Sequence, residues 1–214
     1  YFKNFIPILN IDSINEKYNS LDSIKKSYEY AKNKLVTSIV TLPINKDKLN
    51  SIDKDFIDHT EYFQKIDRNI CNMVFLSKKI IVTPITGHIP INQIDNTINK
   101  SLLRNKINSL LKTLKYDLNI KNIKIAVSGL NPHSGEKGII GNKEEKIIKP
   151  IIDEFKRKGI KIYGPIPGDT IFLPSNLNKY DCFITMFHDQ ALIPFKLLSF
   201  DKGINFTAGL NVIR

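Results

Sequence analysis

The fold is decided by residues 123–163, which read IKIAVSGLNPHSGEKGIIGNKEEKIIKPIIDEFKRKGIKIY. Ile123–Ser128 is a short apolar run that predicts a strand, and Gly129–Gly141 is a glycine-containing loop. Lys143–Lys158 predicts a helix ended by the glycine that follows it, and Ile160–Tyr163 predicts another strand. A strand, loop, helix and strand in this order predict a βαβ unit with two parallel strands.

The same alternation extends through the rest of the chain. Further strands are predicted at Thr37–Leu42, Lys79–Pro84 and Asp181–Phe187, and helical patterns at Leu21–Leu35, with Ser20 or Asp22 as its cap, and at Ile91–Leu118. The fold class is therefore α/β, with a mainly parallel sheet. Open α/β sheets bind ligands at the carboxyl ends of their strands, so we expect a site in the segments that follow the strands.

Composition narrows the class of protein. The chain has 214 residues, of which 42% are hydrophobic, and a formal net charge of +11. The lysines are spread along the whole chain, so we expect no nucleic-acid partner; positive charge also suits phosphorylated ligands, and charge alone leaves that undecided. No apolar run approaches the roughly 20 residues of a membrane span. Cys71 and Cys182 lie far apart, which favours a reducing, cytoplasmic setting.

The chain has four histidines, and each stands beside Gly, Pro, Asp or Thr, so we expect all of them in loops or at strand ends. His88 and His188 are candidate metal ligands, because imidazole binds divalent first-row ions. The H-E-x-x-H pattern is absent, so spacing alone makes no metal prediction, and a turn or capping role is the alternative. Asp189 is a candidate to orient a ligand or to bind a hydroxyl group, with a turn as its alternative.

Three other segments are candidate ligand sites. The loop that begins at Gly129 lets backbone amides approach an anion, although it matches neither G-x-G-x-x-G nor a P-loop. Gly164–Thr170 is rigid enough for a site or for a structural turn. Lys46 follows a predicted strand and could meet a phosphate, although a lone lysine is usually only solvated.

Seven segments together carry a resemblance. They are Thr41–Lys46, Asp58–Tyr62, Thr86–Pro90, Gly129–Glu136, Gly164–Thr170, Phe187–Gln190 and Gly203–Leu210. In order and separation they resemble the motifs of the 4-phosphohydroxy-L-threonine (4-hydroxythreonine-4-phosphate) dehydrogenase family of pyridoxine biosynthesis. The match extends over nearly the whole chain from Val36 onward.

The resemblance implies roles for particular residues. His88 and His188 match two of the family's three metal-binding histidines, and the third is expected beyond Arg214. His59 and Thr60 match the pair that contacts substrate, and Lys46 is a further candidate for the phosphate. The implied cofactor-binding residues are Gly129, Asn131, His133, Gly135 and Glu136. Asp58 stands where the family usually has glycine, and its carboxylate would repel a phosphate.

The resemblance also implies an activity and an architecture. The activity is oxidation of 4-phosphooxy-L-threonine by NAD or NADP with a divalent ion (Zn, Co, Mg, Mn or Ni), then decarboxylation to 3-amino-2-oxopropyl phosphate. The fold implied is the two-lobed α/β/α type of isocitrate and isopropylmalate dehydrogenases, with the active site in the interlobe cleft. Residues 1–56 would be a remnant of the first lobe, 57–198 the second lobe and 199–214 a return toward the first. A cytoplasmic homodimer with a shared active site is implied.

Two alternatives stay open within this resemblance. A paralogue would act on a phosphorylated sugar acid such as a phospho-threonate or phospho-erythronate. A degenerate protein would bind ligands without catalysis, because the chain contains only two of the three expected histidine ligands.

Overall fold

The computed structural model describes residues 19–42 and 59–214. The chain divides into two units, one formed by Tyr1–Asp67 with Asn211–Arg214 and the other by Arg68–Leu210. Lys46 and Asp58 lie outside the described residues. The lobe boundaries that the resemblance implies, at residues 56 and 198, stay a prediction.

The second unit is built on a six-stranded sheet in the order β4-β3-β5-β2-β1-β6. Its strands are β1 Asn72–Leu76, β2 Ile81–Pro84, β3 Lys124–Ser128, β4 Lys161–Ile166, β5 Cys182–Thr185 and β6 Ile204–Ala208. The pairs β4–β3, β3–β5 and β5–β2 are parallel, whereas β2–β1 and β1–β6 are antiparallel. The predicted α/β class and mainly parallel sheet are confirmed. The strands β1 and β6 were not predicted.

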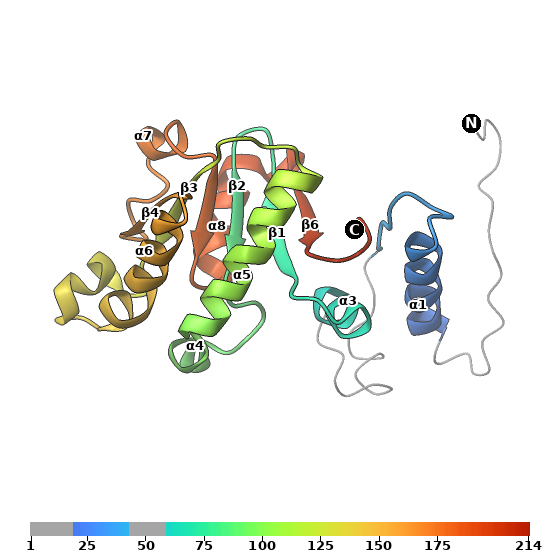
Figure 1. Ribbon diagram of the computed structural model, residues 1–214, viewed down its shortest axis with the longest axis horizontal. Helices are drawn as coiled ribbons and strands as arrows, with labels where there is room; N and C mark the ends of the chain where they lie inside the picture. The colour runs from blue at the N-terminus through green and yellow to red at the C-terminus, as the bar shows by residue number, and fades with distance from the viewer. Residues whose placement is uncertain (1–18, 43–58) are drawn as a thin grey trace. The chain divides into compact units, whose positions relative to one another are not determined.

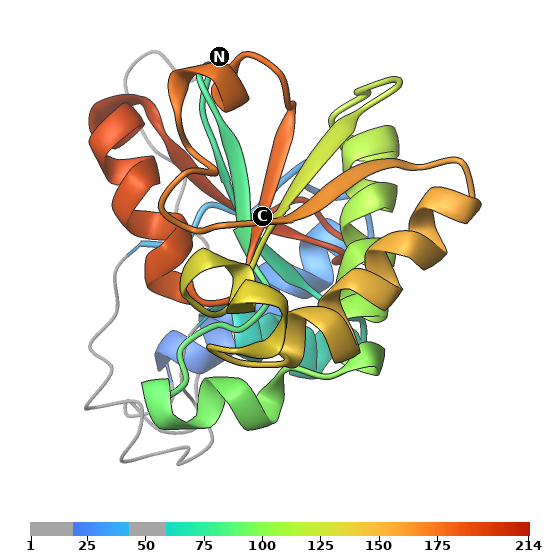
Figure 2. The same ribbon diagram turned by 90° about the vertical axis from the view of Figure 1, so that its left-hand side faces the viewer.

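Helices cover both faces of this sheet (Figures 1 and 2). They are α4 Ile91–Thr97, α5 Lys100–Lys112, α6 Lys149–Arg157, α7 Pro174–Leu177 and α8 His188–Ser199. The helices α5 and α6 lie on one face and α8 on the other (Figure 2). Alternate residues of a strand point to opposite faces, so Ile125 and Val127 pack with the α5–α6 side, and Ala126 packs with the α8 side. Burial on both faces explains why the central strands β2, β3 and β5 are largely apolar.

Two predicted helices are interrupted. The segment Ile91–Leu118 divides into α4, α5 and a π-helical turn at Thr113–Asp117, because Asn99 caps a new helix by accepting a hydrogen bond from the amide of Leu102 at 2.9 Å. The segment Lys143–Lys158 divides into a π-helical turn and α6. Gly159 follows α6 with φ of 81°, which confirms the predicted glycine end.

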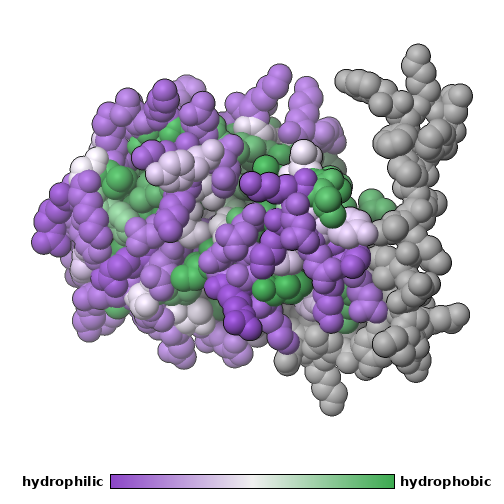
Figure 3. All heavy atoms as spheres, turned by 45° about the vertical axis from the view of Figure 1, so that its right-hand side comes forward, coloured by the Kyte–Doolittle hydropathy of each residue, from purple (hydrophilic) through white to green (hydrophobic). Residues whose placement is uncertain are grey.

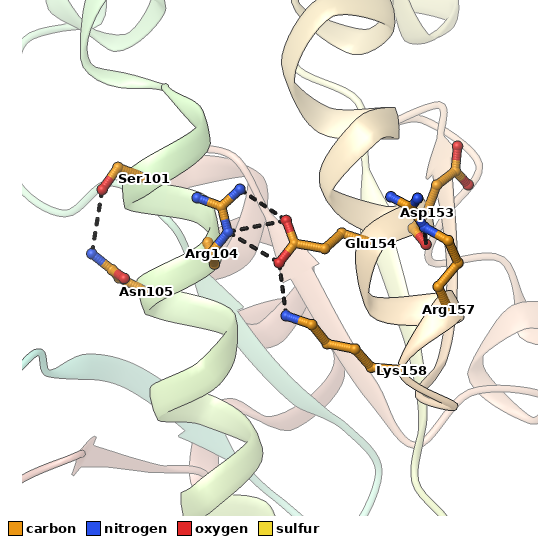
Figure 4. A network of polar contacts seen from close by, with 7 residues as sticks. All are labelled: Ser101, Arg104, Asn105, Asp153, Glu154, Arg157 and Lys158. Carbon is orange, nitrogen blue, oxygen red and sulfur yellow. Dashed lines mark hydrogen bonds and ion pairs between the residues drawn. The ribbon is translucent and has the colours of Figure 1, made fainter.

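The helices α5 and α6 are joined by a charged cluster (Figure 4). Arg104 of α5 donates to both carboxylate oxygens of Glu154 of α6, with an Nη2–Oε2 distance of 2.8 Å, and Lys158 reaches Oε1 at 2.7 Å. These hydrogen bonds, Arg104 first, lower the pKa of Glu154 to about 2. The cluster links the two helices across their exposed sides.

The first unit contains α1 Asn19–Lys32 and α3 His59–Asp67. The hydroxyl of Tyr28 donates to the Asp67 carboxylate, which also accepts hydrogen bonds from the amide and side chain of Asn211 at 3.0 Å. The strand predicted at Thr37–Leu42 is wrong, because the segment has no strand geometry and, within residues 19–42 and 59–214, a single backbone bond outside the segment joins the Ile39 amide to the Ile213 carbonyl at 2.8 Å. A single bond does not form a ladder.

The described surface is predominantly polar. On the face shown in Figure 3, hydrophilic side chains cover most of the area, and hydrophobic side chains form small separate areas between them. Among the described residues, the helices are all too short or too polar to cross a bilayer.

Candidate functional site

The site begins with two parallel strands in the middle of the sheet. Strands β2 and β5 pair through Val82–Phe183, Thr83–Ile184 and Pro84–Thr185. Beyond β2 the chain continues to α4 and α5, and beyond β5 it continues to α8, which covers the opposite face. Adjacent parallel strands whose connections leave toward opposite faces form the switch point where open α/β sheets bind ligands.

His88 and His188 meet at this edge. The ring centroids of the two imidazoles lie 4.9 Å apart, with the ring planes inclined by 49°. His188 is the first residue of α8, and His88 lies in the loop after β2. A hollow of about 170 Å³ opens between them and is lined also by Gly87, Ile94 and Phe187.

Asp189 orients one of the two rings. Its carboxylate oxygen Oδ1 lies 2.7 Å from Nδ1 of His188. An ionised carboxylate only accepts, so Nδ1 carries the proton and the lone pair of Nε2 is available to a ligand. Asp189 also lies in the first turn of α8, where the helix dipole favours a negative charge.

This pair fits a divalent ion. Two imidazoles that bind one zinc ion at about 2.0–2.1 Å have ring centroids roughly 5 Å apart at a tetrahedral angle, close to the separation of the His88 and His188 rings. Within residues 19–42 and 59–214, no three His, Cys, Asp or Glu side chains gather into a metal-binding group. The pair would therefore supply two ligands, and other donors would complete the coordination.

Two polar side chains without a predicted role hold the histidine loops in place. The amide and the hydroxyl of Thr86 both donate to the carbonyl of Met186, at 3.2 and 2.9 Å, which ties the His88 loop to the His188 loop. Gln190 accepts from the amide of Met186 at 2.9 Å and from the hydroxyl of Ser128 at 3.1 Å. Its Nε2 donates to the carbonyl of Gly129 at 3.0 Å. Gln190 therefore connects α8 with the ends of β5 and β3.

The glycine loop after β3 is organised around a buried carboxylate. Oε1 of Glu144 accepts from the amides of Leu130 and Asn131 at 2.8 and 2.7 Å, and Oε2 accepts from the side chain of Asn131 at 3.1 Å. Glu144 is 1% exposed. A Cβ at Gly135, where φ is 76°, would lie 2.6 Å from Oε2 of Glu144, so the packing itself requires glycine there. The first amides of the loop, those of Leu130 and Asn131, are therefore already hydrogen-bonded within the protein.

The rest of the loop has an unusual backbone. Residues 133–137 all have left-handed φ and ψ, from φ of 44° at Glu136 to 76° at Gly135. His133 and Glu136 are exposed, whereas Asn131 and Gly135 pack around Glu144. Among the predicted cofactor residues, His133 and Glu136 are thus the ones that face outward. The loop follows β3, the neighbour of β5, and lies at the same sheet edge as the histidine pair.

The predicted substrate pair lies in the first unit. His59 and Thr60 are the first two residues of α3, and Thr60 is 8% exposed. Nη1 of Arg214 lies 3.4 Å from the hydroxyl of Thr60, and Nη2 lies 2.8 Å from that of Thr41. The guanidinium also lies 5.3 Å from the ring centroid of Phe63. His59 is the first residue of α3, as His188 is of α8. The expectation that all four histidines lie in loops or at strand ends is therefore wrong for these two.

The protein is thus an α/β protein with a candidate metal and ligand site at the switch point of a mainly parallel sheet. Two imidazoles mark this site at the carboxyl edge of the central strands. Comparison with known proteins identifies the family. The chain belongs to the family described as pyridoxal phosphate biosynthetic protein PdxA, whose profile matches residues 10–214. The family expected from the motifs is confirmed.

The chain resembles individual members to a similar degree. It is 38% identical over 197 residues to a 4-hydroxythreonine-4-phosphate dehydrogenase of Bacteroides thetaiotaomicron, covering 91% of this chain and 54% of the relative. It is 38% identical over 192 residues to a D-threonate 4-phosphate dehydrogenase of Pectobacterium atrosepticum, and this match covers 89% of this chain and 59% of the relative. The crystal structure of 4-hydroxythreonine-4-phosphate dehydrogenase from Klebsiella pneumoniae superposes on this chain with a TM-score of 0.82 and a sequence identity of 33%. The superposition covers 92% of this chain and 60% of that one. The chain thus spans somewhat more than half the length of these relatives.

Proposed function

We propose that the chain provides the metal site and part of the substrate site of an NAD(P)-dependent 4-hydroxythreonine-4-phosphate dehydrogenase. The observation that carries the proposal is the pair of imidazoles, 4.9 Å apart, at the switch point of a PdxA-family sheet. In this proposal His88 and His188 hold a divalent ion, and a third histidine beyond Arg214 completes the ligand set.

The reaction oxidises the C3 alcohol of 4-phosphooxy-L-threonine. The C3 hydride passes to the nicotinamide ring, the hydroxyl proton is released, and the product is a 3-oxo acid. The carboxylate of this acid leaves as CO₂, and C2 takes up a proton from solvent to give 3-amino-2-oxopropyl phosphate. A divalent ion held by His88 and His188 would lower the pKa of the alcohol and would polarise the ketone.

The residues of this chain position the reactants. Asp189 holds the proton on Nδ1 of His188 and so leaves the lone pair of Nε2 to the ion. Thr86 and Gln190 keep the two histidine loops in register. The dinucleotide would lie along the outer side of the glycine loop, near His133 and Glu136.

The substrate phosphate requires cationic or hydroxyl donors. Thr60 supplies a hydroxyl at the start of α3, where the unpaired amides of a helix end and its dipole also favour an anion. We assign His59 and Thr60 to the substrate, with Lys46 as a further candidate for its phosphate.

A second substrate is supported by a specific observation. A relative named for D-threonate 4-phosphate matches this chain at 38% identity, the same value as the relative from B. thetaiotaomicron. D-Threonate 4-phosphate carries a hydroxyl where 4-phosphooxy-L-threonine carries an amine. Both substrates therefore offer an alcohol and a phosphate to the same site.

A substrate panel tests the proposal. The intact protein would be loaded with Zn²⁺, Co²⁺, Mn²⁺ or Mg²⁺ and given each substrate with NAD or NADP, while reduced nicotinamide is followed by absorbance. We expect reduction with 4-phosphooxy-L-threonine at a higher kcat/KM than with D-threonate 4-phosphate. The reverse order would assign the second substrate, and no reduction with any combination would refute the dehydrogenase.

We also propose that the protein is a homodimer. The side chains of Ile193, Leu197 and Phe200 on and just after α8 are 61%, 83% and 73% exposed, and such an apolar face favours a subunit contact. Sedimentation of the intact protein tests this: we expect a dimer that Leu197→Lys dissociates. A monomer at micromolar concentration would contradict the proposal.

A further inference from the structure

A second hollow lies at the opposite edge of the sheet, where β3 and β4 begin. It has a volume of about 480 Å³ and is lined by apolar side chains, among them Leu111, Ile120, Ile123 and Ile160. All four pack against the main hydrophobic core on one side and stay partly exposed on the other. This volume lies within the roughly 300–1,000 Å³ of small-molecule sites.

Tight backbone turns lead into both strands beside this hollow. The connection into β3 turns through left-handed residues at Asn119 and Asn122, with φ of 51° and 55°, and the amide of Ile120 bonds back to the carbonyl of Leu114 at 2.8 Å. The connection into β4 turns at Gly159. Both connections turn tightly, and residues on either side of the turns, Ile120, Ile123 and Ile160 among them, line the hollow.

The charge around this hollow has one sign. Lys115, Lys121 and Lys161 line it, and none of its lining residues is acidic. Within residues 19–42 and 59–214 none of these three ammonium groups forms an ion pair; that of Lys115 lies 5.0 Å from the ring centroid of Tyr116. By contrast, Lys143 and Lys149 pair with carboxylates at 3.4 and 3.1 Å. Three lysines beside an apolar floor offer a site that is complementary to an organic anion.

We propose that this hollow binds an amphiphilic organic anion, whose apolar body contacts Ile120, Ile123 and Ile160 and whose carboxylate, sulfonate or phosphate group meets Lys121 and Lys161. The site lies at the amino-terminal edge of the parallel strands, and the histidine pair lies at their carboxyl edge. Binding therefore needs neither the metal nor the substrate, and it stands or falls independently of the dehydrogenase activity.

Two fluorescent probes with the same kind of aromatic body and different charge test the proposal. One is the anion 8-anilinonaphthalene-1-sulfonate, and the other is the neutral N-phenyl-1-naphthylamine. The double variant Lys121→Gln with Lys161→Gln removes the two cations, and Lys78→Gln with Lys79→Gln is the matched control at exposed lysines in the β1–β2 turn. Circular dichroism would verify that both variants keep the fold.

We expect the Lys121/Lys161 variant of the intact protein to bind the sulfonate probe about three- to tenfold more weakly than the wild type, as two partly exposed charge contacts give. The Lys78/Lys79 control and His188→Ala should bind it as the wild type does. The neutral probe should bind all of these proteins with the same affinity. Equal affinity in the Lys121/Lys161 variant and the wild type, equal weakening in the control, or the same loss with the neutral probe would overturn the proposal.

Discussion

Replacement of Gln190 by leucine tests how the ends of the central strands are held together. Leucine has a similar size but cannot accept the hydrogen bonds from the Met186 amide and the Ser128 hydroxyl. Met186 and Ser128 are both fully buried. Each buried donor that loses its acceptor costs about 1–3 kcal/mol. Because Gln190 itself is only half-buried, we expect a loss of roughly 2–4 kcal/mol in the free energy of unfolding.

The assay is urea denaturation of the intact protein, followed by circular dichroism. Gln93→Leu is the matched control, because Gln93 is exposed on α4 and its side chain has no role in the site. We expect Gln93→Leu to stay within about 0.5 kcal/mol of the wild type. Gln190→Glu keeps an oxygen that can accept both hydrogen bonds but loses the donor to the Gly129 carbonyl, so its free energy of unfolding should fall between those of Gln190→Leu and Gln93→Leu. If Gln190→Leu is as stable as Gln93→Leu, Gln190 does not hold the strand ends together.

Three further predictions concern individual ionisable groups. Asp189→Ala should weaken metal binding about 10–100-fold by releasing the His188 ring, and calorimetric titration with Zn²⁺ would measure this; an unchanged affinity would remove the orienting role of Asp189. Since the pKa of Glu154 is lowered from 4.5 to about 2, chiefly by Arg104, its ion pair should stabilise the fold above about pH 4.5 and lose that effect as the pH falls toward 2. Urea denaturation at several pH values should therefore show that the free energy of unfolding falls more steeply with acid in the wild type than in Glu154→Gln. Identical pH dependence of the two proteins would contradict this. Burial raises the pKa of Cys182 to about 12, so its thiol should react with an aromatic disulfide reagent at pH 8 only after denaturation; rapid reaction of the native protein would show that the strand opens.

Much of the second unit could be predicted because its strands are short apolar runs bounded by turn residues. The predicted Ile123–Ser128 and the observed Lys124–Ser128 differ by one residue. Strand β1 was missed because Asn72–Leu76 is buried almost throughout and shows no alternation. Helix α8 was missed because Pro194 lies inside it. The wrong strand at Thr37–Leu42 has the right residue types but no neighbouring strand in the described residues, and composition does not reveal that.

The metal-binding candidates of the site could be predicted from the sequence, but the hydrogen bonds that hold them could not. The histidines His88 and His188 followed from the motifs, and the alternation of elements placed both at the carboxyl edge of a sheet. The bonds that fix them join residues that lie far apart in the sequence: Thr86 is 100 residues from Met186, and Ser128 is 62 residues from Gln190. Such contacts depend on which strands become neighbours. The strand order places β5 between β3 and β2, and no local pattern in the sequence specifies that insertion.

The central claim is that His88 and His188 bind one divalent ion together. The most direct measurement is anomalous X-ray diffraction from crystals of the intact protein grown with Zn²⁺, at wavelengths on both sides of the zinc absorption edge. The account predicts an anomalous peak between the two rings, about 2.0–2.1 Å from a nitrogen of each. Zinc bound elsewhere, with the two imidazoles turned away from each other, would contradict it.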